Sequence, residues 1–226
     1  MRVAVLGTGG VGQTLAAKIA ELGHEVMVGT RDVQAALDRT DAGWGAMVFS
    51  DWHAAHPDVK VGTFAEAAAH AEVVINATAG AASLDALQAA GAKNVEGKIL
   101  IDVSNPLDFS SGMPPTLSVC NTDSLGEQIQ RAFPGAKVVK TLNTVNMNLM
   151  VEPSLVAGGD HHIFVSGNDA AAKAEVTRIL KEWFGWKNVI DLGDMSSARG
   201  PEMLLPLWLQ LSMASQGDLV TIKIVR

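Results

Sequence analysis

Short apolar runs alternate with segments whose apolar residues recur at helical spacing along most of this chain. A continuous apolar run between turn residues is typical of a strand buried on both faces, whereas helical spacing indicates an amphipathic helix. The predicted strands are residues 2–6, 25–29, 60–62, 73–76, 98–103, 136–140, 161–166 and 189–191. The predicted helices are residues 11–22, 32–40, 64–70, 83–90, 123–132, 170–184 and 196–215. Strands that alternate with helices predict an α/β fold with a mainly parallel sheet between two helical layers.

The first predicted strand runs directly into a glycine-rich turn that opens the first helix. The candidate residues of this turn are Gly7, Thr8, Gly9, Gly10, Val11 and Gly12. Gly7 permits a tight turn, Gly9 lets a pyrophosphate approach the backbone, and Gly12 lets the helix pack closely on the strand. The amino terminus of the helix offers unpaired N–H groups to phosphates. This context predicts a dinucleotide site in a Rossmann-type, doubly wound sheet; the alternative is a turn that only connects strand and helix.

The end of the second strand indicates which dinucleotide is bound. An NAD site usually carries a carboxylate there, which binds the ribose 2′-hydroxyl. Here Thr30 and Arg31 stand instead, and a hydroxyl with a guanidinium favours the 2′-phosphate of NADP(H). Asp32 is better interpreted as the N-cap of the next helix. The alternative is that Arg31 is solvated and Asp32 binds the ribose.

Three further loops follow strands at the edge where parallel sheets bind ligands. Asn105 and Asn143 are of the kind that could orient a nicotinamide carboxamide or a substrate carbonyl; the alternative is that they satisfy loop backbone groups. Small residues after the fourth strand suit a loop against a ribose or pyrophosphate. The candidate residues in these loops are Thr78, Ala79, Gly80, Asn105, Pro106, Asn143 and Thr144.

The pattern changes near residue 145, which suggests two parts. We expect residues 1–145 to form the NADP-binding Rossmann domain and residues 146–226 to form a smaller, helical C-terminal portion that completes the cleft. Residues 41–58, which include Trp44 and Trp52, are predicted to be irregular, either a binding loop or a connector, and residues 104–122 are loop-rich. The helix over 196–215, with a kink expected at Pro206, is apolar nearly all round. We expect it to be buried, in the chain's own core or, as we favour, in a homodimer interface.

Composition narrows the classes of function. The 226 residues carry a net charge of −7 without a basic run, which argues against a nucleic-acid partner. No segment is apolar enough to span a membrane, and the single cysteine, Cys120, suits a reducing compartment, so a cytoplasmic location is expected. No general acid or base stands out among the histidines. His53 and His56 lack the further ligands of a metal site. A site of backbone and small residues suits hydride transfer, which needs alignment more than proton transfer.

Four stretches together resemble a known family. They are the opening 1–12, the strand end 28–31, residues 137–144 and residues 197–199. Across most of its length the chain resembles the deazaflavin (coenzyme F-420)-dependent NADP reductases and the reductase domain of the six-transmembrane metalloreductases. The resemblance implies that Thr8, Gly10 and Val11 contact the pyrophosphate, that Thr30 and Arg31 hold the 2′-phosphate, and that residues 78–80, 104–106 and 143–145 surround the nicotinamide.

The resulting hypothesis is an NADP(H)-dependent oxidoreductase that transfers hydride between NADPH and a deazaflavin, a flavin or a similar small acceptor. One alternative is a reductase of imines or β-hydroxyacids. The β-hydroxyacid enzymes use a helical lysine after a glycine-rich turn, and Lys173 and Lys181 lack that context. Another alternative is a module that binds NADP(H) and senses redox state without turnover.

Overall fold

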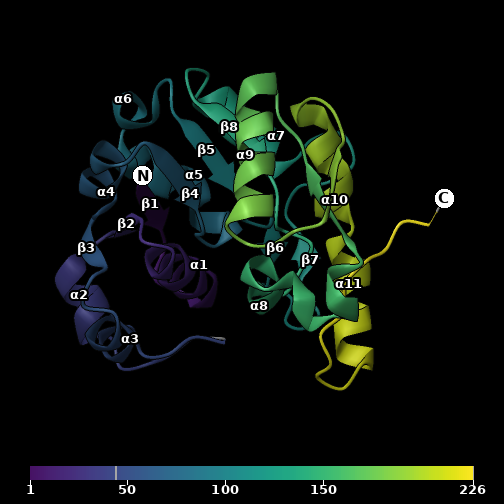
Figure 1. Cartoon of the computed structure of the whole chain (residues 1–226), viewed down its shortest axis with the longest axis horizontal. Coiled ribbons are helices and arrows are strands. Elements are labelled where there is room, and N and C mark those ends of the chain that lie inside the picture. The colour runs from purple at the N-terminus through teal and green to yellow at the C-terminus, as the bar shows by residue number, and fades with distance from the viewer. Residues whose placement is uncertain (44, 226) are drawn as a thin grey trace.

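The computed structural model, which describes residues 1–43 and 45–225, is built around a six-stranded sheet in the order β3-β2-β1-β4-β5-β8 (Figure 1). Trp44 and Arg226 lie outside the described residues. Every pairing in this sheet is parallel. The strands are β1 (Arg2–Leu6), β2 (Glu25–Thr30), β3 (Lys60–Thr63), β4 (Val73–Asn76), β5 (Ile99–Asp102) and β8 (Lys137–Lys140). The Rossmann-type α/β class predicted from the sequence is confirmed.

The strand order reverses beside β1. The chain moves outward from β1 through β2 to β3, returns to β4 on the other side of β1, and then moves outward through β5 to β8. Because all six strands are parallel, their carboxyl ends lie along one edge. In sheets of this kind, ligands usually bind at that edge, beside the point where the strand order reverses.

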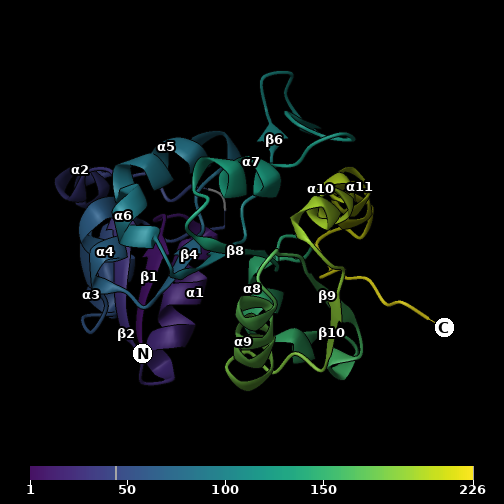
Figure 2. The same ribbon diagram turned by 90° about the horizontal axis from the view of Figure 1, so that it is seen from above.

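Helices cover both faces of the sheet (Figure 2). The alternation of side chains along β1 explains why: Val3 and Val5 join one apolar cluster, and Ala4 and Leu6 join the other. The first cluster includes residues of α1 (Gly10–Glu21), α2 (Val33–Asp38), α3 (Phe49–Ala55), α8 (Met147–Val151) and α9 (Ala170–Glu182). The second includes residues of α4 (Phe64–His70), α5 (Gly80–Ala90), α6 (Ala92–Val95) and α7 (Leu125–Ala132).

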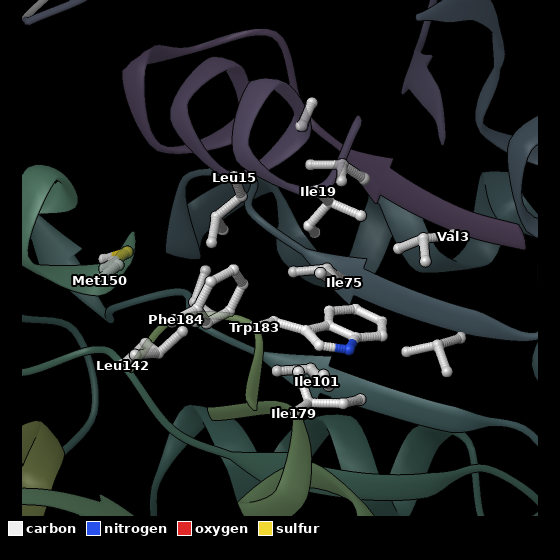
Figure 3. Packing of buried hydrophobic residues seen from close by; sticks show 14 of the residues in the cluster. Val3, Leu15, Ile19, Ile75, Ile101, Leu142, Met150, Ile179, Trp183 and Phe184 are labelled. Carbon is white, nitrogen blue, oxygen red and sulfur yellow. The ribbon is translucent and has the colours of Figure 1, made fainter. Parts of the chain in front are cut away.

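The first apolar cluster joins the two parts of the chain (Figure 3). Ile179, Trp183 and Phe184, from α9 and the turn after it, lie among Leu15 and Ile19 of α1. All five side chains are buried. The residues after 145 therefore pack on the sheet through the same core that holds α1 in place. The division at residue 145 itself stays a prediction.

The chain after β8 adds two strands and further helices. β9 (His162–Val165) and β10 (Asn188–Asp191) pair in parallel, and an antiparallel bridge between Lys140 and Ser166 attaches this pair to β8. Two short strands, β6 (Leu107–Asp108) and β7 (Thr116–Leu117), form an antiparallel hairpin within the loop-rich residues 104–122. This hairpin projects beside α10 and α11 in Figure 2.

One segment predicted to be irregular is partly helical. α3 occupies Phe49–Ala55, inside the segment 41–58. Phe49 and Trp52, three positions apart, are both buried and stacked with ring centroids 5.7 Å apart. The prediction is therefore wrong for residues 49–55. Tertiary burial of two aromatic side chains stabilises a short helix there, despite residues of modest helix propensity.

The end of the chain also differs from the prediction. The single helix expected over 196–215 is divided into a 3-10 turn at Met195–Ala198, α10 (Arg199–Met203) and α11 (Leu205–Ala214). The break falls at Leu204, two residues before Pro206. Because Pro206 has no N–H, it cannot donate the hydrogen bond that would continue the helix, in agreement with the kink predicted at this proline.

Burial of α11 is one-sided. Leu205 and Leu209 are buried, but Leu207 is 54% exposed and Leu211 44% exposed. With Met203, which is 41% exposed, they follow one another at four-residue spacing and form what we call the apolar strip. Burial in the chain's own core, the less favoured of the two alternatives, does not hold for that face, and burial in a homodimer interface stays a prediction.

Candidate functional site

The glycine-rich turn between β1 and α1 has the geometry that its sequence predicts. Gly7 has φ +123°, which side chains rarely adopt. A Cβ on Gly12 would lie 2.1 Å from the Gly7 carbonyl oxygen, so only glycine allows this approach of helix to strand. A Cβ on Gly9 would meet no protein atom within 4 Å. Gly9 therefore borders open space at the amino terminus of α1, whereas Gly7 and Gly12 are needed by the fold.

A segment that the sequence did not link to this turn folds against it. The Gln13 side-chain amide donates to the Met47 carbonyl at 2.9 Å and to the Thr8 carbonyl at 3.1 Å. The Met47 N–H donates back to Gln13 Oε1 at 3.0 Å. A Cβ on Gly10 would lie 3.0 Å from the Gly45 carbonyl oxygen. Residues 45–47 thus pack against the first turn of α1, and the buried Gln13 holds them there.

One guanidinium, that of Arg31, follows β2, and a second, that of Arg39, follows α2. Thr30 is buried, and Arg31 is exposed and makes no ion pair or side-chain hydrogen bond within the described part of the chain. Asp32 Oδ1 instead accepts from the Ala35 N–H at 2.9 Å, which confirms that Asp32 caps α2. Arg39, which the sequence reading missed, lies against the glycine-rich turn. Its Nη1 is 3.4 Å from Thr8 Oγ1, and its buried Nε, which makes no hydrogen bond among the described residues, lies 4.0 Å from Asp41 Oδ1.

The loops after β4 and β5 touch one another. A Cβ on Gly80 would lie 1.9 Å from the Asn105 carbonyl oxygen, so glycine is required where α5 begins. Thr78 donates its hydroxyl to Asn76 Oδ1 at 2.6 Å, and Ala79 is exposed. The Pro106 carbonyl accepts from the Ser118 N–H at 2.8 Å, which joins this loop to the residue after β7.

The two candidate asparagines lie together, and the side-chain amide of each forms a hydrogen bond to the other residue. Asn143 Nδ2 donates to Asn105 Oδ1 at 3.0 Å, and Asn105 Nδ2 donates to the Asn143 carbonyl at 3.0 Å. Asn143 and Thr144 are buried. These bonds fasten the loop after β5 to the loop after β8, and they favour the alternative in which the asparagines satisfy loop groups.

A buried charge cluster beneath these loops was missed by the sequence reading. Lys140, whose side chain is 1% exposed, lies with its Nζ 2.7 Å from Asp102 Oδ2 and 3.0 Å from Glu202 Oε1. Burial alone lowers the pKa of the Lys140 ammonium, but the two carboxylates outweigh that effect and its pKa lies above the ordinary value. The sequence does contain an indication of this cluster. β5 and β8 are apolar strands that end in the charged residues Asp102 and Lys140, and the parallel register places these two residues side by side.

His161, His56 and Lys173 bond to groups outside these loops. His161 is buried, with Nε2 2.8 Å from the Pro153 carbonyl oxygen, and His56 Nδ1 is 2.7 Å from the Trp52 carbonyl oxygen. Lys173 pairs with Asp191 at 2.8 Å. Within residues 1–43 and 45–225, no group of three or more His, Cys, Asp or Glu residues is placed to hold a metal ion. In the same residues, no helix has the length and apolar character needed to cross a membrane.

Arg199, from the 197–199 stretch, faces α7. Its Nη2 is 2.6 Å from Glu127 Oε1 and its Nε is 2.9 Å from Glu127 Oε2. These hydrogen bonds hold the pKa of Glu127 below its usual range. The neighbouring Ser197 hydroxyl donates to Ser166 Oγ at 2.8 Å, so the 3-10 turn before α10 is fixed to the end of β9.

Comparison with known proteins relates this site to characterised chemistry. The family model described as NADP oxidoreductase, coenzyme F420-dependent, matches residues 2–106. The F420-dependent NADP reductase of Methanothermobacter marburgensis is 29% identical over an alignment of 223 positions, and the match covers 96% of this chain and 94% of that protein. The rat metalloreductase STEAP3 is 28% identical over 92% of this chain but only 38% of its own length.

Two solved structures are also similar to this chain, one in fold alone and one in sequence as well. An imine reductase from Streptomyces aurantiacus is 18% identical with a TM-score of 0.61, covers 95% of this chain and 64% of its own, and is alike in fold. A candidate F420-dependent NADP reductase from Arthrobacter sp. FB24 is 60% identical with a TM-score of 0.95, and the match covers 99% of both chains. With that identity over nearly its whole length, the chain belongs to the family of coenzyme F420-dependent NADP oxidoreductases.

Proposed function

We propose that the protein transfers a hydride between NADP(H) and coenzyme F420, a deazaflavin. In the direction from NADPH, two electrons and one proton leave the nicotinamide ring as hydride and join the deazaflavin, which takes a second proton from solvent. NADP⁺ and the reduced deazaflavin are the products. Family membership supports this reaction, and the geometry of the edge formed by the strands' carboxyl ends supports the nucleotide half of it.

The observation that carries the proposal is the chemistry at the end of β2. Thr30 and Arg31 stand at the position where an NAD site usually carries a carboxylate. The next residue, Asp32, does have a carboxylate, but that group caps α2. Arg39 adds a second guanidinium beside Thr8, and its Nε lies 4.0 Å from the exposed carboxylate of Asp41. Two guanidinium groups in this region favour a phosphate on the ribose.

The pyrophosphate has a matching place at the amino terminus of α1. We assign its contacts to the turn Gly7, Thr8, Gly9, Gly10, Val11 and Gly12. The open space beside Gly9 lets a phosphate reach the backbone N–H groups, and the positive end of the helix dipole favours its charge. The residues present therefore fit an NADP nucleotide.

The nicotinamide end is assigned to Thr78, Ala79, Gly80, Asn105, Pro106, Asn143 and Thr144. Their polar groups are largely bonded to one another or to the backbone, so they act as rigid walls and not as acids or bases. Rigid walls suit hydride transfer, which depends on two rings being held in contact and alignment while water is excluded.

The test is a turnover assay with purified protein and NADPH, in which F420, FMN and a cyclic imine are offered separately and NADPH absorbance is followed. We expect oxidation with F420, little with FMN and none with the imine, and a strong preference for NADPH over NADH. Turnover of the imine alone would favour the imine-reductase alternative. Tight NADPH binding with no turnover on any acceptor would favour the redox-sensing module.

We also propose that the protein is a homodimer and that the apolar strip forms part of the contact. Three large apolar side chains in a row on one face of α10 and α11 form a contiguous exposed strip, and such strips often mark protein–protein contacts. Light scattering should give the mass of two chains for the wild type and of one for Leu207→Lys. A cytoplasmic location, where NADPH is plentiful and the single cysteine stays reduced, suits the same proposal.

A further inference from the structure

The ammonium of Lys140 is fully used inside the protein. Besides the two carboxylates described above, its Nζ donates to the Ser104 carbonyl at 2.6 Å. An ammonium has three protons, and here each has an acceptor. Asp102, Lys140 and Glu202 are each at most 1% exposed. Buried charges of this kind are stable only when fully paired, so the three residues form one unit.

Hydrogen bonds extend from this unit to both loops assigned to the nicotinamide end. Asp102 Oδ1 accepts from the Ser104 hydroxyl at 2.6 Å and from Asn76 Nδ2 at 2.9 Å. The other side of the Asn76 amide, Oδ1, accepts from the Thr78 hydroxyl at 2.6 Å. The first residues of the loops after β4 and β5 are therefore positioned by the same carboxylate.

Glu202 brings the C-terminal helices into the unit. Its Oε2 accepts from the Leu125 N–H at 2.8 Å, and its Oε1 accepts from the Gly126 N–H at 3.0 Å. These are the first N–H groups of α7, which no carbonyl within the helix can accept. Glu202 thus caps α7 from α10 while it also pairs with Lys140.

The unit carries a surplus of negative charge. One ammonium faces two carboxylates, and charges in a water-poor interior act over longer distances than charges in solvent. The nicotinamide ring is positively charged in NADP⁺ and neutral in NADPH. A negative charge beneath the loops that hold the ring therefore stabilises the oxidised nucleotide relative to the reduced one.

We propose that Asp102, Lys140 and Glu202 are positioning residues of the nicotinamide site, and that their surplus charge sets the relative affinity for NADP⁺ and NADPH. This inference rests on the proposed function, since it requires that the nicotinamide lies against residues 78–80 and 104–106. The unit then has two effects. It fixes the loops before the cofactor arrives, and it favours release of hydride from bound NADPH.

The test compares nucleotide affinities in Glu202→Gln, which removes the surplus charge while keeping the length of the side chain. The control is Glu72→Gln, the same change in a half-exposed carboxylate at the amino end of β4. Dissociation constants for NADP⁺ and NADPH are measured by titration. We expect the ratio of the NADP⁺ constant to the NADPH constant to rise about three- to tenfold in Glu202→Gln and to stay unchanged in Glu72→Gln.

A merely structural role would change both dissociation constants alike, and an unchanged ratio in folded Glu202→Gln overturns the proposal. Should that variant not fold, Asp102→Asn gives the same charge change and the same expectation. Failure of both to fold would also overturn it, because the carboxylates would then serve the fold and not the cofactor. A wild-type protein that binds neither nucleotide would instead refute the proposed function.

Discussion

The two ends of the candidate site differ in how completely their polar groups are paired within the protein. At the phosphate end, near Gly9, Arg31 and Arg39, polar groups have no complete set of partners within the described chain. At the nicotinamide end, the polar groups bond to one another, as in the Asn105–Asn143 pair. The phosphate end offers free polar groups to a ligand, whereas the loops of the nicotinamide end offer a fixed shape above the buried charges of Asp102, Lys140 and Glu202. Substitutions at the phosphate end should mainly reduce affinity, and loss of the cation in the buried unit should mainly reduce stability.

The largest effect should come from Lys140→Met. Removing the ammonium leaves Asp102 and Glu202 buried without their cation, which typically lowers the free energy of unfolding by about 3–5 kcal/mol. Lys137→Met on the same strand is the control, since its ion pair with Asp169 spans 3.8 Å at the surface and should cost at most about 1 kcal/mol. Urea denaturation measures both, and equal losses would mean that the buried ion pairs of Lys140 stabilise the fold no more than a surface pair does.

Gly9→Val should abolish binding of both NADPH and NADH without affecting the fold. The backbone at Gly9 is extended, with φ −80° and ψ −178°, and a Cβ there meets no protein atom, so valine is tolerated. Its side chain occupies the space assigned to the pyrophosphate, and we expect both dissociation constants to rise at least about 100-fold, or about 2.7 kcal/mol. Titration calorimetry measures this. Retained affinity would refute the placement of the pyrophosphate beside Gly9. A loss of stability like that of Lys140→Met would mean that the fold itself requires a glycine at this position.

Arg31→Ala should have a smaller and more selective effect. Loss of a charge-assisted hydrogen bond to the 2′-phosphate should weaken NADPH binding by about 1–3 kcal/mol, with NADH nearly unchanged and the unfolding midpoint unaffected. NADH is the internal control, because it lacks that phosphate. Equal losses for the two nucleotides would mean that Arg31 does not read the 2′-phosphate, and would leave Arg39 as the candidate.

The features that sequence predicted well depend on neighbours in the chain. The N-cap Asp32 joins residues three apart, so the residues alone indicate it. The turn at Gly7 and the close approach at Gly12 follow from one local motif. Most strands were also predicted from a local signal, because a short apolar run indicates a buried strand without reference to distant residues.

The features that sequence missed depend on distant contacts. A lysine at a strand end normally reaches solvent, and Lys140 is buried only because strand register and α10 bring two carboxylates to it. Arg39 meets Thr8 through the path of the chain after α2, which no motif describes. The sequence left open whether the last helix is buried in the chain's own core or in a dimer, because composition indicates that a helix is apolar but not which of its faces lies in the core.

The partnership of Glu202 with the first turn of α7 has a consequence for biosynthesis. A nascent chain that has emerged only as far as β8 already holds the strands of the central sheet, but α7 then lacks its distant cap and Lys140 lacks its second counter-ion. Ribosome-bound intermediates of that length should be able to assemble the sheet while remaining susceptible to proteases around residue 125, and they should gain protection once α10 leaves the exit tunnel. The order of synthesis therefore makes a finished nicotinamide end one of the last features of the molecule to appear.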